Sequence, residues 1–118
     1  MADSVLRTKS KNFAKDIVFL CRKLKQNGAE SALINQLLRC GTSVGANIHE
    51  AQYAQGTKDF ISKFEIALKE CNESEYWLEL LHRTNYIDDR LYKALSSKCT
   101  SLRVMLITSC KTAKENMK

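Results

Sequence analysis

The side chains of this sequence that could carry chemistry are five cysteines, two histidines and a row of glutamates. The cysteines are spread along the chain, at positions 21, 40, 71, 99 and 110, and no two form a Cys-x-x-Cys pair. His49 and His82 also stand far apart, whereas zinc sites normally show closely spaced ligand pairs. We therefore predict no metal site, and we interpret the cysteines as reduced thiols in a hydrophobic core.

The patterns that accompany enzyme catalysis are missing as well. His49-Glu50 lacks the second histidine of a zinc-protease motif. Glu79 precedes His82 with the spacing found in di-iron bundles, but such a site needs this pair on each of two helices. No glycine-rich phosphate loop follows a predicted strand. We predict a protein that is not an enzyme and has no catalytic residues, no cofactor and no small-molecule substrate.

Composition and periodicity predict the elements that position these side chains. The 118 residues include no proline and four glycines, which favours long helices joined by short turns. Apolar residues recur every three or four positions along the chain, as they do on the buried face of a helix. The predicted helices span roughly residues 4–26, 30–54, 58–84 and 88–113. The expected fold is all-α: a single domain, residues 1–118, forming an up-down-up-down antiparallel four-helix bundle.

Particular residues predict where these helices begin and end. Asn27-Gly28 should stop the first helix, because glycine readily takes the left-handed conformation that closes a helix. Thr57 is the predicted N-cap of the third helix, and Asp88 is the predicted N-cap of the fourth. The residues from Lys111 onwards are expected to fray.

The second predicted helix is unusual in its small residues and in its polar face. Gly41 and Gly45 lie in its middle, where each glycine costs about 1 kcal/mol relative to alanine, so we expect another helix to approach closely there. One face of this helix carries a polar ladder consisting of Arg39, Ser43, Asn47 and Glu50. We expect this ladder to be buried, within or between subunits, as a hydrogen-bonded network in which Glu73 could pair with Arg39. The alternative is an exposed polar surface.

Positive charge is concentrated near the two ends of the chain. The net charge is +6, with a net +5 in residues 1–27 and +4 in residues 88–118. If these segments pack side by side, they form one positive face that holds phosphates without reading sequence. The alternative is a basic surface that serves solubility alone. The candidate residues of this face are Arg7, Lys9, Lys11, Lys15, Arg22, Lys23, Arg90, Lys93, Lys98 and Arg103.

Aromatic residues suggest an interface between subunits rather than a nucleic-acid stacking surface. We do not predict base stacking of the kind found in single-strand-binding proteins. Tyr76 and Trp77 are adjacent and cannot both face the core. A tryptophan that leaves the core usually fills a second contact surface, so we predict that Trp77 and Leu80 lie at a subunit interface. Tyr53 is a weaker candidate for an edge contact.

Two segments carry a resemblance to a known family. LLRCGTSVGANIHEAQ (37–52) and KDFISKFEIALKECNESEYWLELL (58–81) resemble the bacterial four-helix-bundle proteins encoded by intervening sequences of 23S ribosomal RNA genes. The family also includes, more distantly, the accessory variability determinant of diversity-generating retroelements. His49 and Gln52 depart from the alanine and glycine often found at these positions. The matching positions are Arg39, Ser43, Asn47, Ile48, Glu50, Phe60, Ala67, Glu73 and Leu78.

The resemblance implies a bundle that assembles into a ring, most simply a homopentamer, and a role near RNA. The first hypothesis is therefore a ring-forming basic adaptor that binds structured RNA or a ribonucleoprotein through phosphate contacts. The alternative is a structural protein–protein interaction module with no nucleic-acid role. The N-terminal segment MADSVLRTKSKNF has no apolar core of a signal peptide, and no apolar run is long enough to cross a bilayer, so we expect a cytoplasmic protein without membrane contact.

Overall fold

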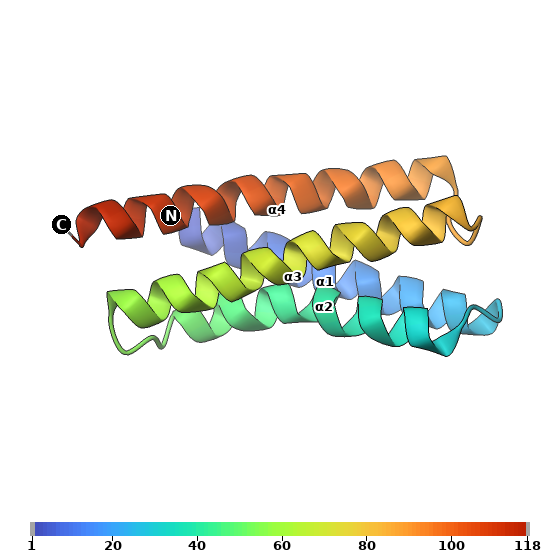
Figure 1. The fold of residues 1–118 in the computed structure, drawn as a ribbon, viewed down its shortest axis with the longest axis horizontal. Helices are drawn as coiled ribbons and strands as arrows, with labels where there is room; N and C mark the ends of the chain where they lie inside the picture. Colours follow the sequence, from blue (N-terminus) through green and yellow to red (C-terminus); the bar gives the residue numbers. More distant parts are fainter. Residues whose placement is uncertain (1, 118) are drawn as a thin grey trace.

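The computed structural model describes the backbone of residues 2–117 and the side chains of residues 4–117. Four helices make up an elongated bundle of about 50 × 22 × 19 Å (Figure 1). They are α1 (Ala2–Gln26), α2 (Ser31–Ala51), α3 (Thr57–Arg83) and α4 (Asp89–Asn116). No strand occurs in residues 2–117, so the all-α prediction is confirmed. Residues 1 and 118 of the predicted domain lie outside the described residues.

The helices alternate in direction, as predicted from the short connections between them. Each helix packs against the next one along the chain, and α4 returns to lie beside α1 (Figure 1). The contact between α1 and α4 is the least extensive of the four. The bundle is therefore held chiefly by the three junctions between consecutive helices, α1/α2, α2/α3 and α3/α4.

The core follows the apolar stripes of the sequence. Side chains three and four positions apart on each helix face inwards, so apolar area is removed from water along the whole length of the bundle. All five cysteines are buried within or beside this core. Its largest fully buried side chains are Leu6, Phe13, Ile17, Leu24, Leu37, Val44, Ile48, Phe64, Leu78, Leu81, Leu102 and Leu106.

The predicted turns between α1 and α2 and between α3 and α4 are confirmed. Gly28 has a φ of 76°, the left-handed conformation that a helix-closing glycine supplies. Asp88 caps α4, since its side chain accepts a hydrogen bond of 2.8 Å from the backbone N–H of Leu91.

The helix bounds differ from the prediction at three points. Thr57 is the first residue of α3 and not its N-cap. The N-cap position is occupied by Gly56, which has a φ of 137°. The helix α2 ends at Ala51 and not at residue 54, because the backbone N–H groups of residues 52–54 bond three residues back in tight turns. The helix α4 continues to Asn116, so the expected fraying from Lys111 is wrong for residues 111–116.

The small residues of α2 let α1 approach closely. A Cβ atom on Gly41 would lie 2.9 Å from the Cγ1 and Cγ2 atoms of Ile17, closer than carbon atoms pack. A Cβ atom on Gly45 would lie 3.3 Å from the backbone oxygen of Ser10. The close packing of α1 therefore requires glycine at position 41. The lower helix propensity of glycine is offset by the closer contact between α1 and α2.

Candidate functional site

The basic side chains of α1 point in several directions. Arg7 and Lys11 line a groove between α1 and α2. Lys9 reaches the other way and donates a hydrogen bond of 3.1 Å to the hydroxyl of Ser101 on α4. The guanidinium of Arg22 lies 5.7 Å from the centre of the Phe19 ring. Lys15 and Lys23 are exposed.

The basic side chains of α4 are partly neutralised by acids. Lys98 forms an ion pair with Asp16 of α1, and Arg103 forms one with Glu75 of α3. Arg90 and Lys93 are exposed in the first turns of α4. These residues and those of α1 therefore do not form one continuous positive face, because Arg103 turns to the α3/α4 junction and Arg7 and Lys11 turn to α2.

A groove of about 790 Å³ lies between α1 and α2. Its floor is open because Gly45, Ala46 and Ala14 carry little or no side chain. Tyr53 lies at its rim in the turn after α2 and is 74% exposed. Sequence reasoning did not connect Tyr53 with the basic residues of α1, because the two are far apart in sequence and meet only when α2 folds back along α1.

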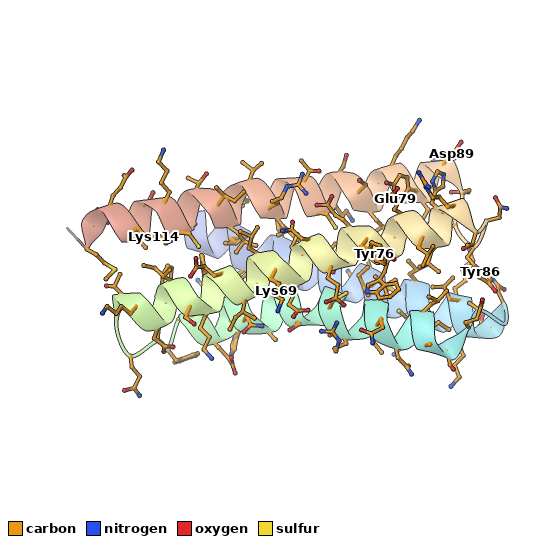
Figure 2. All side chains as sticks on the ribbon, in the orientation of Figure 1. Lys69, Tyr76, Glu79, Tyr86, Asp89 and Lys114 are labelled. Carbon is orange, nitrogen blue, oxygen red and sulfur yellow. The ribbon has the colours of Figure 1, made fainter. Side chains whose placement is uncertain are left out.

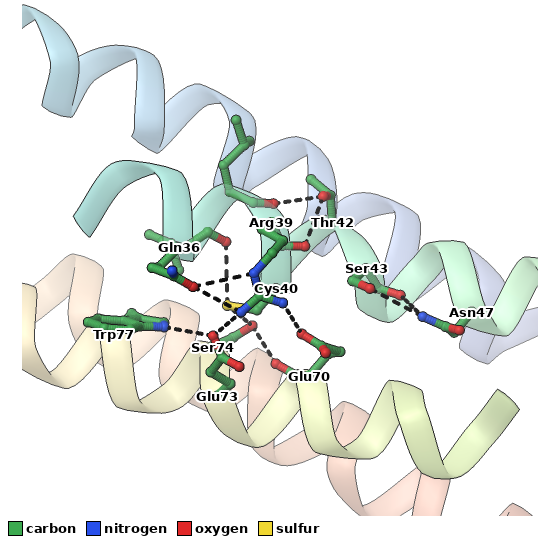
Figure 3. Close-up of polar contacts among 12 residues, drawn as sticks. Gln36, Arg39, Cys40, Thr42, Ser43, Asn47, Glu70, Glu73, Ser74 and Trp77 are labelled. Atoms are coloured by element: carbon green, nitrogen blue, oxygen red, sulfur yellow. Dashed lines mark hydrogen bonds and ion pairs between the residues drawn. The ribbon is translucent and has the colours of Figure 1, made fainter. Parts of the chain in front are cut away.

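The polar ladder of α2 runs along its junction with α3 (Figure 3). Arg39 donates to Glu70 at 3.0 Å and pairs with Glu73, the contact that the sequence suggested. Asn47 donates to the backbone oxygen of Ser43 at 2.8 Å and to its hydroxyl at 3.2 Å.

The ladder is not buried within the subunit. The Arg39 side chain is 49% exposed, and Ser43 and Asn47 are only half-buried. At the far end of the ladder, the exposed Glu50 lies 3.4 Å from Lys63 of α3. Long charged side chains such as these keep their charged ends in water, so the face would become enclosed only in an assembly.

The predicted interface residues lie on α3 beside this ladder. Trp77 is half-buried, and its indole N–H donates to Glu73 at 3.0 Å (Figure 3). Leu80 is also half-buried. Tyr76 is 60% exposed and meets Trp77 edge to face, with ring centres 4.9 Å apart (Figure 2). The residue that leaves the core most fully is therefore Tyr76, while Trp77 covers the α2/α3 junction.

Two buried thiols and a carboxylate meet at the α3/α4 junction, a cluster that the sequence did not predict. The sulfur atoms of Cys71 and Cys99 and a carboxylate oxygen of Glu75 all lie within 4.8 Å of one another. Cys71 donates to the backbone oxygen of Cys99 at 3.4 Å, and Arg103 neutralises Glu75. Because both thiols are fully buried and the carboxylate is already paired, we interpret the cluster as packing.

The other thiols are protonated core residues. Burial, with a smaller contribution from the nearby Cys40 thiol, raises the pKa of Cys21 to about 11. Burial also raises the pKa of Cys40 and that of Cys110. A thiol with a raised pKa is a poor nucleophile at neutral pH, which agrees with the interpretation of the cysteines as core residues.

None of the helices described here combines the length and hydropathy needed to span a bilayer.

Comparison with known proteins identifies the family of this chain. No curated protein matches the chain significantly. A crystal structure of a protein of unknown function from the S23 ribosomal protein family of Bacteroides thetaiotaomicron is similar, with 48% identity and a TM-score of 0.91, over 94% of this chain and 99% of that one. Residues 2–108 match the family described as 23S rRNA-intervening sequence protein, and the chain belongs to that family.

Proposed function

We propose that this protein is a non-enzymatic, ring-forming basic bundle that binds structured RNA in the cytoplasm through phosphate contacts. The observation that carries the proposal is that several basic side chains of α1 have no acidic partner. Arg7, Lys11, Lys15 and Lys23 form no ion pair with an acid among the described side chains, so their charge is available to an external anion. Phosphate contacts of this kind supply affinity without reading base sequence.

The family description supports RNA as the polyanion. It connects these proteins with an intervening sequence of 23S rRNA, and the similar Bacteroides protein is assigned to a ribosomal protein family. The net charge of +6 favours association with a polyanion over association with basic partners.

The ring is proposed from the resemblance and from the surface of α3. Exposed Tyr76 and half-buried Trp77 and Leu80 present apolar area at the surface of α3, and aromatic side chains at a surface are typical of a contact surface. We expect the protein to elute as a multiple of its 13.4 kDa chain, most simply five chains, in size-exclusion chromatography with light scattering.

A charge placed on this surface should break the assembly. Tyr76→Glu changes an exposed residue, so the chain should fold and elute as a smaller species. Val104→Glu, at an equally exposed position on α4, is the matched control and should leave the assembly intact. A wild-type mass of one chain would contradict the proposed ring.

RNA binding is tested by fluorescence anisotropy of a labelled 23S rRNA fragment at several salt concentrations. We expect binding at about 50 mM salt whose logarithm falls linearly with the logarithm of salt concentration, with a slope corresponding to several phosphates. Absence of binding at this salt concentration would overturn the proposal.

The second candidate function is a protein–protein interaction module with no nucleic-acid role. It is favoured by apolar side chains that lie outside the Tyr76 surface, since Phe19 on α1 and Val104 and Ile107 on α4 are each about half exposed. If the RNA fragment does not bind, this function replaces the first, and the basic residues serve solubility.

A further inference from the structure

The α1/α2 groove brings together chemical groups that are separate in the sequence. Arg7 and Lys11 enter it from α1, while His49 and Tyr53 enter it from α2 and the turn that follows. A volume of about 790 Å³ lies within the range of small-molecule pockets. The groove is open along one side, so a residue of a longer polymer can enter without its neighbours being enclosed.

Arg7 is held in place within the groove, and both cations remain available to an anion. Arg7 donates through Nη1 to the side-chain oxygen of Gln52, the residue next to Tyr53. This bond fixes the guanidinium at the end of α2, and the other N–H donors of a guanidinium remain for an anion. Among the lining residues, the acidic side chain is that of Glu50, and its carboxylate lies beside Lys63 of α3.

The aromatic side of the groove offers a flat apolar surface to solvent. The Tyr53 ring is 74% exposed, and the His49 ring lies 5.7 Å from it, tilted by 58°. An exposed aromatic residue that lines the same groove as two cations is the combination that holds an unpaired nucleotide, because the base stacks and the phosphate pairs. A double helix cannot use the ring, because its bases are already stacked on one another.

We propose that this groove binds one unpaired nucleotide of RNA, with the base stacked on Tyr53 and the phosphate held by Arg7 and Lys11. The inference rests on the proposed RNA-binding function and deepens it, because it assigns an unpaired element of the RNA to a specific site. It also revises the expectation, drawn from the sequence, that base stacking plays no part.

The first test compares single-stranded and double-stranded RNA oligonucleotides of equal length by fluorescence anisotropy. Stacking of one base contributes about 1–3 kcal/mol, so Tyr53→Ala should weaken single-strand binding by roughly 5- to 150-fold and leave duplex binding unchanged. Tyr53→Phe should bind like the wild type. Val104→Ala removes exposed apolar area on α4, away from the groove and from the Tyr76 surface, and is the control that should have no effect on single-strand binding.

The second test separates failure of the groove from failure of the proposed function. We expect 5′-AMP at millimolar concentration to shift the backbone NMR resonances of Gly45, Ala46 and Tyr53 in the wild type and not in Tyr53→Ala. These shifts would support the groove even if the 23S rRNA fragment does not bind. Affinity for 5′-AMP equal to that for the single strand would identify a free nucleotide, and not RNA, as the ligand and overturn the inference.

Two further results would overturn the assignment. One is single-strand binding by Tyr53→Ala within about twofold of the wild type. The other is no shift of the groove resonances with 5′-AMP, which would refute the groove even if duplex RNA binds to the basic residues elsewhere.

Discussion

The α1/α2 and α3/α4 junctions both contain basic side chains, and the two junctions treat them differently. At α1/α2, Arg7 and Lys11 line an open groove, and Glu50 is drawn away to Lys63. At α3/α4, Arg103 pairs with Glu75 and Lys114 lies 3.2 Å from Glu65. The first junction leaves positive charge for a ligand, while the second uses it within the fold.

The difference originates in the packing residues. Gly41 and Gly45 bring α1 close to α2, and the small residues Gly45, Ala46 and Ala14 line the hollow between the two helices. At α3/α4, acids on α3 face bases on α4. A count of basic residues therefore overstates the positive charge that is available for binding. Whether the charge of a basic residue is available depends on whether an acidic side chain already pairs with it.

Among the changes that test this comparison of the two junctions, the largest effect on stability is expected at Gly41. Gly41→Ala adds a Cβ atom 2.9 Å from two carbons of Ile17, and overpacking of this kind costs about 1–3 kcal/mol. The gain in helix propensity returns about 1 kcal/mol, so we expect a net loss of up to about 2 kcal/mol in the free energy of unfolding, measured by urea denaturation. Gly45→Ala, with its nearest contact at 3.3 Å, should cost less. A Gly41→Ala protein more stable than the wild type by the full helix-propensity gain of about 1 kcal/mol would show that α1 and α2 do not pack this closely.

A smaller effect is expected from the paired charges of the α3/α4 junction. Arg103 and Glu75 are each about one-third exposed, and a pair in this setting contributes roughly 0–1 kcal/mol. We expect Arg103→Gln to lower the free energy of unfolding by up to about 1 kcal/mol, and less at high salt. Lys11→Gln at the groove should leave stability unchanged, since Lys11 has no acidic partner among the described side chains. Equal losses for the two variants would contradict the division between paired and available charge.

The smallest effect is expected at the turn that joins α3 to α4. His82 bonds to Asp89 at 2.6 Å and, by this bond and its charge, lowers the pKa of Asp89. A carboxyl group whose pKa is lower in the folded state adds stability above its unfolded pKa of about 4 and loses it as the pH falls through the folded value. His82→Ala should therefore raise the NMR titration midpoint of Asp89. An unchanged midpoint would show that the pair does not form in solution.

Much of the fold could be predicted from the sequence, because its causes are local. The apolar period, the glycine at position 28 and the cap at Asp88 each act within a few residues, and the structure has them where the pattern predicts. The end of α2 was predicted three residues late, because no glycine or proline marks it before Gly56. That early end matters, since it places Tyr53 in a turn at the rim of the groove.

The candidate site was less predictable, because it depends on how each helix is rotated against its neighbours. The sequence shows that Arg103 is basic, but only the packing of α4 on α3 directs it to Glu75. The same holds for Tyr53 and Arg7, which come together through the fold alone. The ladder residue Arg39 was placed on the correct helix face, yet that face is partly exposed and not buried within the subunit.

The most direct test of the central claim compares two double variants that remove equal charge from the two junctions. Arg7→Gln/Lys11→Gln acts on the groove, and Arg103→Gln/Lys114→Gln acts on the paired junction. Anisotropy with the 23S rRNA fragment gives the slope of log affinity against log salt for each. If the groove cations hold phosphates, the first pair lowers the magnitude of that slope by roughly 1.4 to 1.8, at 0.7 to 0.9 per phosphate contact, and the second leaves it almost unchanged. Equal reductions from both pairs would show that net charge alone governs binding and would contradict the account.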